Sequence, residues 1–385
     1  MNADAEHAEI RDAVARLCER FPGEYWRRLD RERAYPAEFV AALQEAGFLS
    51  ILIPERYGGS GLGVSEACAV LEQIHASGCN GASCHAQMYT MGTLLRHGSD
   101  AQKEAYLPAI AQGRLRLQAF AVTEPESGTD TSRIRTTAVR RGDRYVVNGR
   151  KVFISRTEHS DLMLLLARTA PRGAGPKPTD GLSVLLVDLR DAVGHGLTVR
   201  PIQTMMNHST TELFFDGLEV PAANLIGEEG KGFRCLLDGM NAERILIAAE
   251  CIGDARWFVD RASRYASERE VFGAPIGRNQ GVQFPIARAH VRTEAAVLMV
   301  RRAAALFDAG ERCGAEANMA KLLASEASWD AADVCMQTFG GYGFAEEYDV
   351  ERKFRETRLY RIAPVATNLI LSYVATHVLD MPRSF

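Results

Sequence analysis

The chain has 385 residues, a length that suits two or three structural units and a large buried core. Hydrophobic residues make up 46% of it and charged residues 24%, which excludes a wholly disordered protein. Its 45 basic and 49 acidic side chains nearly cancel, so the composition gives no reason to expect nucleic acid or a membrane surface as a partner.

The cysteines and the charge-poor segments bear on location and metal binding. None of the eight cysteines forms a C-x-x-C pair, so we expect reduced thiols in a cytoplasmic protein, with no disulfide framework and no metal site. Residues 1–21 are charged throughout and lack the apolar core of a secretory signal. Residues 76–95 and 363–379 hold too many polar side chains to span a membrane, so no membrane segment is expected.

Residues 1–115 have the pattern of a helical domain. Apolar side chains at helical spacing predict helices over 5–20, 36–46 and 65–76. Gly47 is placed to end the second of these helices, because glycine is the common residue just past a helix C-terminus.

Residues 116–221 have the pattern of a β domain. Short β-branched or apolar runs alternate there with turn residues, which predicts a small antiparallel sandwich or barrel. Asn148-Gly149 is a strong signal for a two-residue hairpin turn, so we expect it to join two strands. The expected strands cover residues 117–123, 136–139, 145–147, 152–155, 162–167 and 182–187.

Residues 222–385 are predicted to be helical again. Long helices are expected over 230–265, 282–310, 315–337 and 367–378. The order of helical, β and helical segments predicts an α+β protein of three domains, with boundaries near residues 115 and 221.

Two features have the composition of functional sites. The loop 120–130 gathers hydroxyls, glycine and backbone amides that can surround a pyrophosphate or the edge of a polar ligand, although an ordinary polar turn has the same composition. Glu243 and Glu250 lie on one face of a mainly apolar helix, with no Lys or Arg three or four residues away. Such a carboxylate is either a general base with a raised pKa or the partner of a distant arginine, and the helix alone does not decide between them.

Four segments resemble, in order, signatures of the acyl-CoA dehydrogenase family of flavoproteins. Residues 122–130 resemble T-E-P-x-[AS]-G-[ST]-D, and residues 148–155 resemble N-G-x-K-x-[WF]-I-[ST]. Residues 269–280 resemble R-x-x-F-G followed by Gln, and residues 337–344 resemble Q-x-x-G-G-x-G-[FY]. The resemblance extends over essentially the whole chain.

The resemblance implies a helical domain, a β-barrel or sandwich domain and a C-terminal four-helix bundle, together with FAD and a homotetramer built as a dimer of dimers. In the family pattern, one set of residues lines the flavin ring and its phosphates, and a second set reaches the FAD of a neighbouring subunit. The first set is Phe120, Val122, Thr123, Gly128, Thr129, Phe153, Ile154, Ser155, Thr367 and Asn368, and the second is Arg269, Phe272, Gln280, Gln337, Gly340 and Gly341.

The sequence differs from many family members at the position of the catalytic base. Those members carry a catalytic Glu in an I-Y-E-G-T run, where this chain has Pro364. The isovaleryl and long-chain branches instead place the base on the earlier helix directly before an Arg, as Glu243 precedes Arg244 here. The resemblance therefore implies that Glu243 is the base, that Thr129, Asn241 and Arg244 bind substrate, and that Glu250 is structural or a spare base.

The implied activity is FAD-dependent α,β-dehydrogenation of an acyl-CoA to a trans-2-enoyl-CoA in fatty-acid β-oxidation. Glu243 would remove the α-proton, a hydride would pass to flavin N5, and an electron-transferring flavoprotein would accept the electrons. The Pro364 departure keeps open a flavin monooxygenase or nitroalkane oxidase on the same fold, and a non-catalytic thioester-binding protein is a further alternative. The acyl chain stays open, as does the choice between CoA and an acyl-carrier protein.

Overall fold

The computed structural model describes residues 7–383, and the chain forms two compact units. The first, here called the helical unit, consists of the chain up to Glu32, Gly63–Gly81 and the chain from Asn241 onward. The second, here called the sheet unit, consists of Arg33–Leu62 and Ala82–Met240. The three sequence domains proposed above stay a prediction beside this division.

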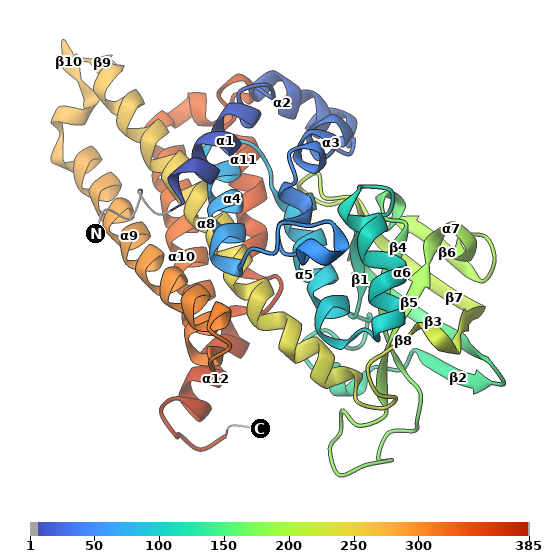
Figure 1. Cartoon of the computed structure of the whole chain (residues 1–385). Coiled ribbons are helices and arrows are strands. Elements are labelled where there is room, and N and C mark those ends of the chain that lie inside the picture. The colour runs from blue at the N-terminus through green and yellow to red at the C-terminus, as the bar shows by residue number, and fades with distance from the viewer. Residues whose placement is uncertain (1–6, 384–385) are drawn as a thin grey trace. The chain divides into compact units, whose positions relative to one another are not determined.

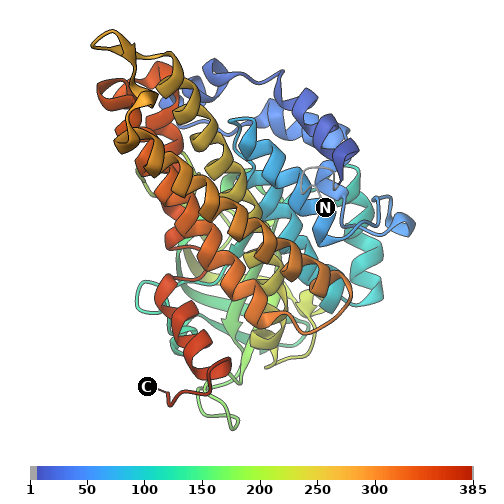
Figure 2. The ribbon, with the colours of Figure 1, turned by 90° about the vertical axis from the view of Figure 1, so that its left-hand side faces the viewer.

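Long helices build the helical unit. Figures 1 and 2 show α9 and α10 running side by side. Alanines fill many of the buried positions between α8, α9 and α10, such as Ala262 and Ala331, and small side chains let helices pack closely. The helices of this unit are α1 (Ala8–Cys18), α2 (Gly23–Glu32), α4 (Val64–Ala76), α8 (Gly232–Glu268, which begins in the sheet unit), α9 (Gln280–Asp308), α10 (Gly314–Phe339), α11 (Val350–Thr357) and α12 (Thr367–His377).

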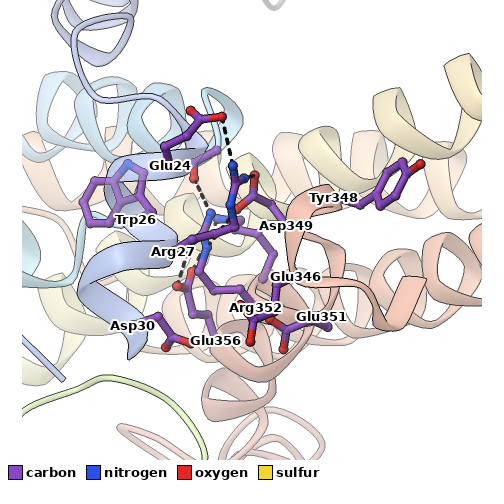
Figure 3. A network of polar contacts seen from close by, with 12 residues as sticks. Glu24, Trp26, Arg27, Asp30, Glu346, Tyr348, Asp349, Glu351, Arg352 and Glu356 are labelled. Atoms are coloured by element: carbon purple, nitrogen blue, oxygen red, sulfur yellow. Dashed lines mark hydrogen bonds and ion pairs between the residues drawn. The ribbon is translucent and has the colours of Figure 1, made fainter. Parts of the chain in front are cut away.

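A network of paired charges joins α2 to α11 and to the short helix η9 (Glu346–Tyr348) (Figure 3). Arg27 donates to Asp349 at 2.7 Å, and the almost fully buried Arg352 donates to Glu356 at 2.8 Å. Nearby, Lys353 is completely buried and bonds Asp254. A buried charge needs such a partner, since removing one member of a buried pair costs ~3–5 kcal/mol.

One twisted sheet forms the centre of the sheet unit. Its strands pair in the order β6-β7-β3-β2-β4-β5-β8, and β1 pairs with β4 in parallel. The strands are β1 (Leu117–Ala121), β2 (Thr137–Arg141), β3 (Arg144–Ser155), β4 (Leu162–Arg168), β5 (Leu182–Asp188), β6 (Leu197–Pro201), β7 (Thr210–Pro221) and β8 (Leu225–Ile226), and the helices are α3 (Ala37–Glu45), α5 (Ala82–His97), α6 (Asp100–Ala111) and α7 (Leu189–Ala192).

The sheet is covered on both faces at its centre. Along β4, Leu164 belongs to a core cluster that also holds Met91 of α5 and Leu107 of α6, whereas Leu165 belongs to a second cluster formed by the strands. Successive side chains of a strand point to opposite faces. A strand buried on both faces is therefore a continuous hydrophobic run, as residues 162–167 are.

The expectation for Asn148-Gly149 was wrong. Both residues lie inside β3, and the hairpin between β2 and β3 turns instead at Gly142, whose φ is 63°. Gly149 has φ 147° at a shift in the pairing of β3 with β7, and a Cβ there would lie 2.5 Å from the Thr136 side chain. The glycine is needed for a bulge and a close approach, not for a turn.

Within residues 7–383 the remaining expectations on element type agree with the structure, while residues 5 and 6 of the first expected helix lie outside the described residues. The α+β class is confirmed, with 57% helix and 17% strand. Five helices, α2, α5, α6, α7 and α11, went unpredicted as separate elements. Within residues 7–383, no helix has the length and apolar character required to cross a membrane.

Candidate active site

In the sheet unit, the loop that follows β1 is closed by its own backbone. The Glu124 N–H donates to the Ser127 carbonyl at 3.2 Å, and the Ser127 N–H donates back to the Glu124 carbonyl at 3.0 Å. The Ser127 hydroxyl donates to the Asp130 carbonyl at 2.6 Å. Gly128 and Thr129 lie at the exposed part of this loop, where their backbone amides and hydroxyl are open to a ligand.

A buried ion pair fixes this loop against β3. Lys151 is completely buried, and its Nζ donates to the Val122 carbonyl at 2.8 Å and to Glu124 Oε1 at 3.0 Å. Glu124 also accepts the backbone N–H groups of Arg135 and Thr136, at 2.7 and 2.9 Å. Burial lowers the pKa of Lys151 to about 8, although the charge of Glu124 and its hydrogen bond to Lys151 act to raise it. Burial opposes the charge of Glu124, but Lys151 and these donors hold its pKa below the ordinary value.

Sequence reasoning missed the role of Glu124 and Lys151. Both are fixed letters of the quoted signatures, the E of T-E-P and the K of N-G-x-K. The signatures mark both positions, but they do not say that the two side chains pair with each other. A Lys and a Glu on neighbouring segments pair when both are buried, so these residues shape the loop and do not themselves face a ligand.

The predicted flavin-facing residues of β1 and β3 lie together. The Val152 N–H donates to the Thr123 carbonyl at 3.0 Å, which joins the end of β3 to the segment that contains Phe120 and Val122. Phe153 has φ 59° and is 64% exposed, whereas Ile154 beside it is buried. A bulky residue with positive φ is strained, and such strain gathers at ligand sites.

In the helical unit, Glu243 lies on α8 beside Asn241 and Arg244. Arg244 Nη1 donates to the Asn241 side-chain oxygen at 3.0 Å. Within residues 7–383, the Glu243 carboxylate makes no hydrogen bond or ion pair. Burial raises its pKa to about 7, against the opposing charges of Arg244 and Lys321. A carboxylate in this state is ionised in part at neutral pH and is basic enough to take a proton.

Glu250 has a different environment two turns further along α8. It is completely buried, with Oε1 3.7 Å from His75 Nε2. His75 Nδ1 lies 2.9 Å from Asp254, and its Nε2 accepts the Gly81 N–H at 2.9 Å. Glu250 thus belongs to the polar interior of the helical unit, which favours its structural interpretation.

The residues expected to reach a second subunit lie at one end of the helical unit, near the hairpin of β9 (Glu270–Val271) and β10 (Ala274–Pro275) (Figure 1). The Arg269 guanidinium lies 6.0 Å from the centre of the Tyr342 ring, so the hairpin and the 337–344 segment meet. Phe272, at the turn, is fully exposed with φ 54°. The other members are exposed: Gln280 at the start of α9, Gln337 near the end of α10, and Gly340 and Gly341 after it.

The last two predicted cofactor residues, Thr367 and Asn368, begin α12. The Thr367 hydroxyl donates to the Arg361 carbonyl at 3.4 Å, and Asn368 is exposed.

The predicted site residues are divided between the two units: residues 120–129 and 153–155 belong to the sheet unit, and all others belong to the helical unit. Among the residues that the structure describes, no group of three or more His, Cys, Asp or Glu side chains is arranged to hold a metal.

Three family models match the chain in succession. They describe the acyl-CoA dehydrogenase N-terminal domain over residues 4–114, the middle domain over 119–218 and the C-terminal domain over 230–379. The chain belongs to the acyl-CoA dehydrogenase family, a family of oxidoreductases. The family resemblance and the fold expected from the sequence are thereby confirmed.

Individual relatives agree with this assignment. The chain is 36% identical over 384 residues to acyl-CoA dehydrogenase FadE12 of Mycobacterium tuberculosis strain H37Rv, covering 99% of this chain and 97% of the relative. A solved glutaryl-coenzyme A dehydrogenase in complex with glutaryl-CoA has a TM-score of 0.92 and 30% identity, with 100% and 98% coverage. An FAD complex of PigA has a TM-score of 0.91 and 26% identity, with 99% of both chains covered.

Members of this family are FAD flavoproteins, so the expected cofactor is confirmed for the family. The residues of this chain fit that group. An exposed aromatic ring on strained backbone at Phe153 offers a surface for a flat, partly apolar ring system. The exposed backbone amides at Gly128 and Thr129 offer donors for phosphate oxygens.

Proposed function

We propose that this chain is an FAD-dependent dehydrogenase that converts an acyl-CoA thioester to a trans-2-enoyl-CoA. The observation that carries the proposal is Glu243, a carboxylate with a pKa of about 7 that makes no hydrogen bond or ion pair within the described residues. Structural carboxylates in the same unit have partners, as Asp349 and Glu356 do. Glu243 lacks one, and an unpaired, desolvated carboxylate is typical of a general base.

The cofactor would be held by the residues predicted to line the flavin ring and its phosphates and by those predicted to reach the FAD of a neighbouring subunit. Phe120, Val122 and Thr123 would line the ring with Phe153, Ile154 and Ser155. Gly128 and Thr129 would bind phosphate oxygens, and Thr367 and Asn368 would add contacts. The remaining contacts would come from a neighbouring copy of the chain, through Arg269, Phe272, Gln280, Gln337, Gly340 and Gly341. When bound, the flavin supplies the acceptor for the hydride that leaves the β-carbon.

Glu243 performs the proton transfer in this proposal. Its carboxylate accepts the proton from the α-carbon of the thioester as the α,β double bond forms. Its pKa of about 7 suits that task at neutral pH, because part of the population is ionised and the ionised form is a stronger base than an ordinary carboxylate. Pro364 has no group that can accept a proton, so the position used by many relatives takes no part.

Substrate binding is assigned to the residues beside the base. The Arg244 guanidinium is held by Asn241 and carries the positive charge that a phosphate-bearing carrier requires. Thr129 adds a hydroxyl. CoA is the carrier that the glutaryl-CoA complex supports, and the acyl chain is the variable that the experiment below determines.

The proposed assembly is a homotetramer, a dimer of dimers, that passes electrons to an electron-transferring flavoprotein in the cytoplasm. Exposed apolar side chains support self-association. Phe284, Val291 and Leu298 are exposed on α9 at seven-residue spacing, which places them along one face of the helix. Exposed apolar patches of this kind are typical of protein interfaces.

An anaerobic titration of the purified yellow protein with acyl-CoAs of different chain length and branching tests the proposal. We expect at least one of them to bleach the flavin absorbance band, and we expect Glu243→Gln to bind the same acyl-CoA without bleaching. Oxygen consumption by reduced flavin, with no bleaching by any acyl-CoA, would point to a monooxygenase or a nitroalkane oxidase. A colourless protein that binds no flavin would point to a non-catalytic role, and full activity in Glu243→Gln would remove the base assignment.

A further inference from the structure

Arg168, the last residue of β4, is a buried arginine whose guanidinium bonds backbone carbonyls. Its Nε donates to the Ile134 carbonyl at 3.1 Å, and its Nη2 donates to the Ser132 carbonyl at 3.0 Å. Its Nη1 donates to the Asp180 carbonyl at 3.1 Å. Within residues 7–383, no carboxylate forms an ion pair with it. Because a charge loses its hydration when it is buried, a guanidinium without an ion partner requires an explanation.

Two buried side chains hold the segment 132–136 in place. Arg168 bonds its carbonyls: two of them accept the guanidinium, and that of Thr136 accepts the Arg168 backbone N–H at 2.8 Å. Glu124 bonds its N–H groups, namely those of Arg135 and Thr136. The backbone of this segment is therefore fixed by the carboxylate and by the guanidinium together.

This segment continues the loop that contains the predicted phosphate donors, Gly128 and Thr129. In the residue that follows them, Asp130 Oδ1 accepts the Ser132 N–H at 3.2 Å and the Ser132 hydroxyl at 2.5 Å. The Ser132 carbonyl in turn accepts the guanidinium of Arg168. An unbroken series of hydrogen bonds therefore runs from the guanidinium to the residue beside the two exposed amides.

Arginine suits this position because its guanidinium bonds two separate segments at once. Besides residues 132–134, it bonds the loop 169–181 through the Asp180 carbonyl. That loop is closed at its base, where the Thr169 N–H donates to the Gly181 carbonyl at 2.8 Å. A guanidinium presents its donors in a rigid planar fork, whereas a lysine has a single nitrogen on a flexible stem. A lysine would therefore keep the charge without joining the two segments.

We propose that Arg168 is a positioning residue for the proposed cofactor site: its guanidinium fixes the segment 132–136, so that the exposed amides of Gly128 and Thr129 keep the arrangement that binds phosphate oxygens. The inference rests on the proposed function, because this arrangement matters only if the loop holds the phosphates of FAD. A loop fixed in advance binds more tightly, since a mobile one must be ordered on binding. The charge of Arg168 acts in the same direction, because phosphate groups are anionic.

The first test is the dissociation constant of FAD for the full chain, measured by flavin fluorescence on serial dilution of the purified protein. In Arg168→Met we expect this constant to rise about tenfold, because the loop must now be ordered on binding. Arg168→Lys should have a smaller effect. Gln102→Leu is the matched control in the same unit, because buried Gln102 donates to the carbonyls of Ala223 and Leu225 at 2.7 and 2.8 Å. It should lower the melting temperature without weakening FAD binding.

The second test needs neither flavin nor turnover. Amide hydrogen exchange is followed by mass spectrometry on peptides that cover residues 127–136, in wild type, Arg168→Met and Gln102→Leu. We expect faster exchange of these peptides in Arg168→Met, because the loop has lost one of its two anchors. In Gln102→Leu their exchange should match that of wild type. If Arg168→Met does not fold, Arg168→Gln replaces it, since its amide can still donate to one carbonyl.

The outcomes separate the inference from the proposed function. FAD binding in Arg168→Met that is as tight as in wild type, or no weaker than in Gln102→Leu, overturns the role of Arg168, and so does unchanged exchange of residues 127–136. A wild-type protein that binds no flavin overturns the proposed function and the cofactor role of Arg168 with it. In that case the hydrogen exchange still reports whether Arg168 fixes the loop.

Discussion

Replacing Glu243 by glutamine should stabilise the protein, and the gain should grow with pH. Burial raises the pKa of Glu243 from 4.5 to about 7. Between these values the folded protein still holds a proton that the unfolded chain has released, so this group lowers the free energy of unfolding as pH rises through that range. The loss is about 1 kcal/mol at pH 5.5 and about 3 kcal/mol at pH 8.5, using ~1.36 kcal/mol per pH unit. Glutamine fits the same space and has no charge to desolvate.

The melting temperature of wild type and Glu243→Gln, measured by scanning fluorimetry from pH 5.5 to 8.5, checks this reasoning. With about 2.1 cal/mol/K of unfolding entropy per residue over 385 residues, the extra 2 kcal/mol corresponds to about 2–3 °C. Glu268→Gln, at the exposed end of the same helix, is the control and should show no such trend. A difference between wild type and Glu243→Gln that is constant with pH, or that shrinks as pH rises, would refute the assignment of a desolvated, unpaired carboxylate.

Three further predictions concern other parts of the chain. Lys151→Met leaves Glu124 buried without its cation, so it should lower stability by ~3–5 kcal/mol and reduce the flavin retained after gel filtration, whereas Lys151→Arg should lose less. Asp308 accepts the Val64 and Ser65 N–H groups at the start of α4, at 2.7 and 2.9 Å, so Asp308→Ala should cost ~1 kcal/mol in denaturant titration, and an unchanged midpoint would contradict this capping role. All eight cysteines are buried, so a colorimetric thiol reagent should react with them only after denaturant is added, and rapid reaction of the native protein would contradict their burial.

Periodicity predicted most of the long helices and strands, and it did not single out α5, where burial removes the contrast between two faces. The helix α5 is buried over most of its length and contains buried polar side chains such as Gln87 and Thr90. Its sequence therefore has no apolar stripe opposed to a polar one, and only its lack of charge stood out. Asn148-Gly149 failed for a related reason. An Asn-Gly dipeptide indicates a backbone conformation that glycine adopts more easily than other residues. A bulge inside a strand requires such a conformation as much as a turn does.

The candidate site divides in the same way. Glu243 could be proposed as the base from sequence, because a carboxylate on an apolar helix face is unusual and its position before Arg244 resembles a branch of the family. The partners Glu124 and Lys151 could not be assigned from sequence, because their roles depend on which distant side chains become buried together.

The charged side chains inside the helical unit include both paired and unpaired groups. Arg352 and Lys353 are paired at short range with carboxylates, and a buried charge requires such a partner. Glu243 and Lys321 make no ion pair within residues 7–383, and burial brings their pKa values to about 7 and about 8. Charging either group inside the protein lowers the free energy of unfolding, and both groups titrate near neutral pH. Neither group is therefore suited to holding the fold together. An unpaired carboxylate of this kind suits a site where a proton is taken up and released at every turnover, and this contrast with the paired carboxylates supports the proposal that Glu243 is the base.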